Sequence, residues 1–146
     1  LLLLTGAIMG NRDYLSPLTG KHWQPSGDGY VLVKTEKGLD HYLALAKKAH
    51  KPVLIEFYAS WCLDCRIMAE RVFSREPIQR TLENFVWIKI DVTQEKPAVV
   101  ALQKRFKVIG PPAYIFFSAE GKMESTLSFV GIKSLSETQR IIAQAG

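Results

Sequence analysis

The sequence contains only two cysteines and three histidines in 146 residues, and both scarcities narrow the possible chemistry. Two cysteines are too few for the disulfide framework of a small secreted scaffold, and too few for a zinc ribbon, which needs four ligands. The histidines, His22, His41 and His50, all precede the cysteines and show no ligand spacing. A mixed cysteine and histidine site is the alternative that stays open, but we expect no metal and no bound cofactor.

Signatures of nucleotide and nucleic-acid binding are also missing. The chain has no glycine-rich phosphate loop and no basic stripe interleaved with aromatic residues, so we expect no nucleic acid as a partner. The net charge of +5 comes from scattered basic residues. The densest group, Lys47, Lys48, His50 and Lys51, falls at the end of a predicted helix, where cations suit the negative end of the helix dipole. We interpret it as a solvated helix end rather than a binding patch.

No apolar run reaches the roughly 20 residues that a helix needs to cross a bilayer. Residues 1–9 are nearly all apolar, and three hypotheses compete for them: the tail of a transmembrane helix, part of a signal peptide, or a core element. Residues 11–29 are rich in Gly, Pro, Ser, Asn and Asp, which is typical of a linker. We divide the chain into a membrane tail (1–10), a linker (11–29) and a domain (30–146).

Within the predicted domain, patterns of strands and helices alternate. Short apolar runs predict strands at 30–33, 53–59, 85–92, 113–117 and 127–130. Helical spacing predicts helices at 35–49, from the cysteines to about 74, at 77–82, 96–106 and 134–145. Such alternation implies parallel strands with crossover helices, and the last two strands add an antiparallel hairpin. We predict an α/β fold with a central mixed β-sheet flanked by helices on both faces.

The two cysteines, Cys62 and Cys65, stand where the buried strand gives way to a helix. Only a thiolate attacks a disulfide, and the unpaired N–H groups and positive pole of a helix start stabilise that anion. Cys65 lies one helical turn later on the same face, so it can resolve a mixed disulfide formed by Cys62. We predict that Cys62 is the exposed nucleophile and Cys65 the more shielded thiol. The alternative is a pair of unreactive core cysteines.

The segment FYASWCLDC, residues 57–65, resembles the active-site segment of thioredoxins. In that family a tryptophan precedes the first cysteine, and a buried acid lies on the strand six residues before it. Trp61 and Glu56 occupy these two places. The resemblance implies a thioredoxin-like fold, a redox-active disulfide between the two cysteines in place of a cofactor, and a substrate-binding role for Trp61.

A second segment, IGPPAYIFF at residues 109–117, resembles the loop that faces the thiols in thioredoxins, usually written Gly-x-Pro before a strand. The resemblance implies that Pro112 is a cis-proline, since cis peptide bonds are essentially a proline feature. It also implies that Gly110, Pro111 and Pro112 contact the substrate, because a fixed turn can present backbone groups to an extended segment.

Residues 51–62, 72–78 and 108–112 are similar to the C-terminal periplasmic domain of the DsbD family of thiol:disulfide interchange proteins. In that family a thioredoxin-like domain follows a multi-span membrane domain. The resemblance implies a monomeric reductase domain that is anchored at the bacterial inner membrane and faces the periplasm. It would relay electrons from the membrane domain to protein disulfide substrates, including another domain of the same protein, and so to periplasmic isomerases and cytochrome c biogenesis.

Several departures bear on mechanism. The buried acid of the family is usually aspartate and is Glu56 here. At the position of a second carboxylate of the family this sequence has Ala69, so we assign no role to a second acid. Because Asp64 and Glu56 both oppose a thiolate, we predict a weakly depressed pKa for Cys62 and a reducing pair. We hypothesise that a desolvated Glu56 exchanges a proton with Cys65; the alternative is a satisfied buried acid.

Two other functions stay open on the sequence. The first is a free-standing thioredoxin-like reductase dedicated to cytochrome c maturation. The second is a binding module with a thioredoxin fold whose thiols take no part in catalysis.

Overall fold

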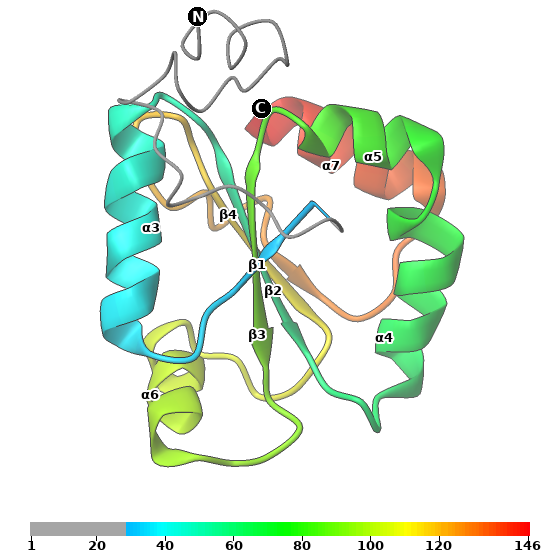
Figure 1. Ribbon diagram of the computed structural model, residues 1–146. Coiled ribbons are helices and arrows are strands. Elements are labelled where there is room, and N and C mark those ends of the chain that lie inside the picture. Colours follow the sequence, from blue (N-terminus) through cyan, green and yellow to red (C-terminus); the bar gives the residue numbers. More distant parts are fainter. Residues whose placement is uncertain (1–28) are drawn as a thin grey trace, which may run out of the picture.

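In the computed structural model, which describes residues 29–146, strands and helices alternate along the chain (Figure 1). The elements are β1 (Val31–Leu32), α3 (Glu36–Lys48), β2 (Val53–Tyr58), α4 (Leu63–Met68), η2 (Ala69–Phe73), α5 (Glu76–Leu82), β3 (Val86–Asp91), α6 (Pro97–Arg105), β4 (Ala113–Phe117), β5 (Phe129–Val130) and α7 (Leu135–Ala145). The predicted membrane tail, 1–10, and all but the last residue of the predicted linker, 11–29, lie outside the described residues. No described helix is both long and apolar enough to cross a membrane.

The five strands form one mixed sheet in the order β1-β3-β2-β4-β5. The strands β1, β3 and β2 run parallel to one another, whereas β4 is antiparallel to β2 and β5 is antiparallel to β4. Helices α3 and α6 cover one face of the sheet, and α4, α5 and α7 cover the other (Figure 1). The predicted fold class is confirmed.

Strand β2 lies in the middle of the sheet, and its residues divide between two apolar cores. Ile55 and Phe57 belong to the core with Leu39 of α3 and Leu102 of α6. Leu54 belongs to the second core, on the face covered by η2, α5 and α7. Successive strand residues point to opposite faces. Coverage on both faces explains why this strand reads as a nearly continuous apolar run.

The helix that carries the cysteines ends at Ser74, close to its predicted limit, but it is not α-helical throughout. After α4, the π-helical turn η2 follows, in which the N–H of Ser74 donates to the carbonyl of Ala69, 2.9 Å away. This i to i−5 bond inserts one extra residue into the turn and places the neighbours Val72 and Phe73 both in the core. Pro77 stands in the first turn of α5, as predicted.

One cap confirms a predicted helix start, and one turn shortens a predicted strand. The hydroxyl of Thr35 accepts the N–H of Gly38 at 3.0 Å and caps α3 as predicted. The predicted strand 127–130 is too long, because only Phe129–Val130 pairs with β4. The N–H groups of Leu127 and Ser128 both donate to the carbonyl of Glu124, so these residues close a turn instead.

The packing predicts a contrast between two isoleucines. Ile88 of β3 is fully buried, whereas Ile109 is fully exposed on a loop. Ile88→Ala is expected to lower the free energy of unfolding by about 2–5 kcal/mol through lost burial and a cavity. Ile109→Ala, the matched control, is expected to change it by less than about 0.5 kcal/mol. Urea unfolding of both variants measures the difference, and equal losses would contradict the described core.

Candidate active site

The cysteine pair lies at the junction between β2 and α4. Cys62 is the N-cap of α4: its backbone is extended, with φ −88° and ψ 109°, and its Sγ accepts the N–H of Cys65 at 3.2 Å. The two residues form a disulfide, and their Cα atoms are 5.3 Å apart. The predicted placement of the pair at a helix start is therefore confirmed. The cap directs a backbone dipole at the sulfur that would carry the negative charge.

The prediction that the first thiol is the more exposed one is wrong for this disulfide form. Cys62 is only 8% exposed and joins the apolar core that contains Ala59 and Val92, whereas Cys65 is half-buried. The Cys62 side chain turns back over the first helical turn, because it both accepts the N–H of Cys65 and bonds to its sulfur. Spacing along the chain does not reveal that inward turn.

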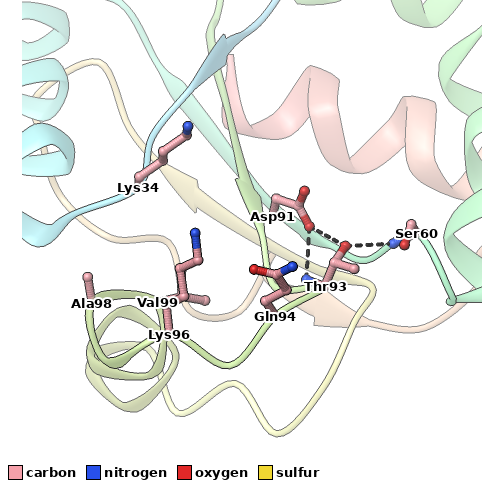
Figure 2. Close-up of a pocket in the computed structure, with 8 residues that line it drawn as sticks. All are labelled: Lys34, Ser60, Asp91, Thr93, Gln94, Lys96, Ala98 and Val99. Atoms are coloured by element: carbon pink, nitrogen blue, oxygen red, sulfur yellow. Dashed lines mark hydrogen bonds between the residues drawn. The ribbon is translucent and has the colours of Figure 1, made fainter.

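The segment before the cysteines is held by a loop residue that the sequence analysis missed, Thr93 (Figure 2). The N–H of Ser60 donates to the Thr93 hydroxyl at 2.9 Å, and the indole N–H of Trp61 donates to the Thr93 carbonyl at 3.3 Å. Thr93 is fixed in turn by Asp91, whose Oδ1 accepts both its N–H, at 2.9 Å, and its hydroxyl. An Asp two residues before a Thr at a strand end is a turn signal that could have identified this loop.

The predicted proline loop lies at the same edge of the sheet as the cysteines. Ala113, the residue after Pro112, pairs with Phe57 near the end of β2, which leads into the cysteine segment. The bond between Pro111 and Pro112 is cis, as predicted, and Pro112 is buried. The N–H of Gly131, beside β5, donates to the Pro112 carbonyl at 2.9 Å and fixes the loop from the other side.

Large apolar side chains are exposed around this edge. Two of them flank Cys62, and one immediately precedes the proline loop. The other two lie in β5 or just after it, where Val130 pairs with Ala113. We call this set the apolar rim, and its members are Trp61, Leu63, Ile109, Val130 and Ile132, each between 49% and 102% exposed. Clustered exposed apolar groups mark surfaces that contact other proteins. Trp61 therefore lies where a substrate-binding residue is expected.

Glu56 is buried in the middle of β2, at 7% exposure. Burial raises the pKa of its carboxyl, as the sequence analysis expects. The Lys89 ammonium lies 3.6 Å from Oε2 and lowers the pKa of Glu56, against the effect of burial. The buried indole N–H of Trp87 also lowers this pKa, although it forms no hydrogen bond of normal geometry. Tyr114, the β4 partner of Glu56, has its pKa raised by its own burial first and then by the Glu56 charge.

Lys89 is a second residue that the sequence analysis missed. Its ammonium lies 4.3 Å from the ring centre of Tyr30, 5.2 Å from that of Tyr58 and 5.1 Å from that of Trp87. These rings stabilise a partly buried cation and hold it against Glu56. A single lysine inside the apolar run 85–92 is itself a signal, because a charge in a buried strand needs a partner.

The described residues form neither a second buried acid nor a metal site. Ala69 and Glu70 are both exposed on η2, so neither position supplies a second buried acid. Among residues 29–146, no group of three His, Cys, Asp or Glu side chains is arranged to hold a metal ion.

Comparisons of sequence agree with this geometry. A family model described as thioredoxin-like matches residues 34–119. The thiol:disulfide interchange protein DsbD of Ralstonia nicotianae is 37% identical over 125 residues, and DsbD 1 of Pseudomonas aeruginosa is 34% identical over 133 residues. These matches cover 81% and 86% of this chain but only 21% and 22% of those proteins. The chain thus spans about a fifth of the length of these curated relatives.

Comparisons of structure point the same way. The oxidised C-terminal domain of DsbD from Neisseria meningitidis superposes with a TM-score of 0.67 at 26% identity, covering 79% of this chain and 99% of that one. Thioredoxin O2 of Arabidopsis thaliana, in its oxidised state, gives a TM-score of 0.63 at 18% identity, covering 82% and 96%. The second likeness concerns the fold alone.

The buried Glu56 predicts a pH dependence of stability. Because its pKa is raised from 4.5 in the folded state, the folded protein binds more protons than the unfolded chain between the two pKa values. The free energy of unfolding therefore falls as pH rises from about 4.5 through the raised pKa. Glu56→Gln removes this contribution, so its stability relative to the original protein is expected to increase with pH.

Urea unfolding of the oxidised proteins between pH 4.5 and 8 measures this trend. Glu70→Gln, at an exposed carboxylate, serves as the matched control and is expected to run parallel to the original protein. A constant offset between Glu56→Gln and the original protein over the whole range would show that the buried carboxyl does not titrate differently on folding.

Proposed function

Because the chain belongs to the thioredoxin-like family, we propose that residues 30–146 form a reductase domain that exchanges its dithiol for the disulfides of partner proteins. The observation that carries the proposal is the Cys62–Cys65 disulfide at the start of α4, where the first sulfur is the helix cap. The likeness to DsbD proteins, which are named for thiol:disulfide interchange, supports the same reaction. The redox-active group is the disulfide itself.

The reaction is two successive exchanges. In the reduced protein, the Cys62 thiolate attacks one sulfur of the partner disulfide, and the other partner sulfur leaves as a thiolate. Cys65 then loses its proton and attacks Sγ of Cys62, which forms the internal disulfide and releases the second partner thiolate. Two electrons pass from the dithiol to the partner, whose two thiolates take up protons. The N–H of Cys65 stabilises the first anion.

The second exchange needs a base for Cys65, and we assign that role to Glu56. Its carboxyl is buried on the strand that leads into the site, and its raised pKa makes it a stronger base than an exposed carboxylate. Lys89 favours the charged carboxylate and so keeps the group able to release the proton again. Glu56 and Lys89 thus work as one unit.

The partner docks on the apolar rim with the segment that flanks its disulfide. The proline loop offers backbone groups there, in the manner of strand addition. Pro111 has no N–H, so it can only accept a hydrogen bond through its carbonyl. At Gly110, no atom lies within 4 Å of the position that a Cβ would take, which leaves room for a passing chain. Trp61, next to Cys62, adds an exposed ring to the same surface.

The direction of transfer is reduction of the partner. Asp64 stands in the first turn of α4, and an acid there opposes a thiolate on Cys62. Weak stabilisation of the thiolate leaves the disulfide form favoured, so the dithiol gives up its electrons readily. A pair with this environment is reducing rather than oxidising.

The domain works as part of a larger protein. The span of about a fifth of the DsbD relatives supports a role as one domain among several. In this proposal residues 1–10 end a membrane helix of the bacterial inner membrane, and residues 11–29 tether a monomeric domain in the periplasm. Electrons arrive from the membrane domain and leave to protein disulfides, including another domain of the same protein.

Trapping tests the order of the two thiols. Reduced Cys65→Ala protein, mixed with insulin, is expected to accumulate a mixed disulfide through Cys62, because the resolving sulfur is gone. It appears as a reductant-sensitive covalent complex on a gel. Cys62→Ala, the matched control, is expected to form none. A reduced original protein that neither turns over insulin nor yields the complex in its Cys65→Ala form would be a binding module instead.

Kinetics test the role of Glu56. Glu56→Gln is expected to slow turnover with a disulfide substrate by tenfold or more between pH 6 and 9, because general base assistance to Cys65 is lost. The first exchange does not use Glu56 as a base, and loss of its charge favours the Cys62 thiolate, so the double variant Cys65→Ala/Glu56→Gln is expected to form the mixed disulfide no more slowly than Cys65→Ala. Unchanged turnover across this pH range would leave Glu56 as a structural acid.

A further inference from the structure

A hollow of about 400 Å³ lies directly beside the segment that leads into Cys62 (Figure 2). Its walls come from the ends of β1 and β3, from the start of α6 and from Ser60, two residues before Cys62. We call it the side pocket. Nothing in the exchange reaction described above uses it.

Two lysines from different elements line the side pocket. Lys34 follows β1 and Lys96 immediately precedes α6, and Figure 2 shows both side chains on the wall opposite Asp91 and Thr93. Among residues 29–146, neither lysine forms an ion pair with a carboxylate. The Asp91 carboxylate is already engaged, since its Oδ1 accepts the N–H and the hydroxyl of Thr93. The pocket therefore carries two lysines without an ion pair and one carboxylate, which leaves a net positive charge.

The lysine positions are unfavourable in the free protein. Lys96 is the N-cap of α6, makes no capping hydrogen bond and places a cation at the positive end of a helix dipole. Lys34 brings a second cation to the same hollow. A bound anion would relieve both repulsions, and Gln94 and Ser60 add hydrogen-bond donors to the same walls.

The side pocket is joined to the reactive segment by hydrogen bonds. Ser60 donates to Thr93 at 2.9 Å, and Trp61 of the apolar rim donates to the same residue at 3.3 Å. Because Trp61 belongs to the apolar rim and Thr93 lines the pocket, a partner chain that lies against Trp61 has residues near its disulfide within reach of the pocket. An anion reaches this site most directly as part of that chain.

We propose that the side pocket, through Lys34 and Lys96, binds an acidic side chain that lies close to the disulfide of the partner protein. The inference rests on the proposed reductase function and adds the kind of partner: one with Asp or Glu beside its cystine. Two exposed charge pairs make such a partner react about three- to tenfold faster at low salt.

The test uses two synthetic peptides with one internal disulfide each, identical except that a residue flanking the cystine is Glu in one and Gln in the other. The reduced full chain is mixed with each, and the second-order rate of peptide reduction is measured. The original protein is expected to reduce the Glu peptide three- to tenfold faster at 20 mM salt. That preference is expected to shrink at 0.5 M salt, where exposed charges are screened.

The double variant Lys34→Gln/Lys96→Gln is expected to reduce both peptides at one rate. The matched control is Lys47→Gln/Lys48→Gln, which makes the same change of charge in the last turn of α3. Lys47 lies beside Val53 at the start of β2, whereas the side pocket lies at the end of the parallel strand β3. It is expected to keep the preference. All four lysines are exposed, so neither variant removes a core side chain.

Two results would overturn the inference alone: equal reduction of both peptides by the original protein, or a preference that survives in the Lys34→Gln/Lys96→Gln variant. A preference lost equally in both double variants would also overturn it, because overall charge would then suffice. If the original protein reduces neither peptide, the proposed function fails and the inference fails with it.

Discussion

The whole arrangement depends on a sulfur atom that caps a helix. The first turn of a helix leaves backbone N–H groups without partners, and an oxygen of Ser, Thr or Asp usually accepts one of them. Here Sγ of Cys62 accepts the N–H of Cys65. The same contact that fixes the start of α4 also stabilises the negative charge that a nucleophilic thiol must carry. Folding and reactivity thus share one hydrogen bond.

The topology of the sheet supplies the surroundings of that sulfur. Because β3 and β4 lie on either side of β2, three loops meet at one edge: the loop from β2 to α4, the loop from β3 to α6 and the loop before β4. The first carries Cys62, the second Thr93 and the third Pro112. Ligands of α/β sheets gather at such edges, where the strand order changes direction. In the proposed function, a partner protein would therefore contact the thiol, the loop that supports it and the docking surface together.

Much of this arrangement can be predicted from the sequence, because its signals are local. Three short patterns each predict the structure at their own position: the apolar run of β2, the cap at Thr35 and the proline pair. The rest depends on contacts between distant segments or on a change of helical period. The π-helical turn η2 alters the helical spacing of the buried residues, and no proline or glycine in its sequence indicates the change. Lys89 contacts Glu56 only because β2 and β3 pair in this register. The inward turn of Cys62 depends on its bond to Cys65. The spacing of the two cysteines allows that bond but does not predict the direction of the Cys62 side chain.

The reduction potential of the Cys62–Cys65 pair tests the central claim most directly. Equilibration of the protein with a defined thiol and disulfide buffer, followed by quantification of the reduced and oxidised forms, gives this value. A helix cap opposed by the nearby acids Asp64 and Glu56 predicts a couple close to the thioredoxin value of about −270 mV. A value near about −120 mV, typical of a strong oxidant with a highly stabilised thiolate, would contradict the account, as would a pair that does not equilibrate with the buffer.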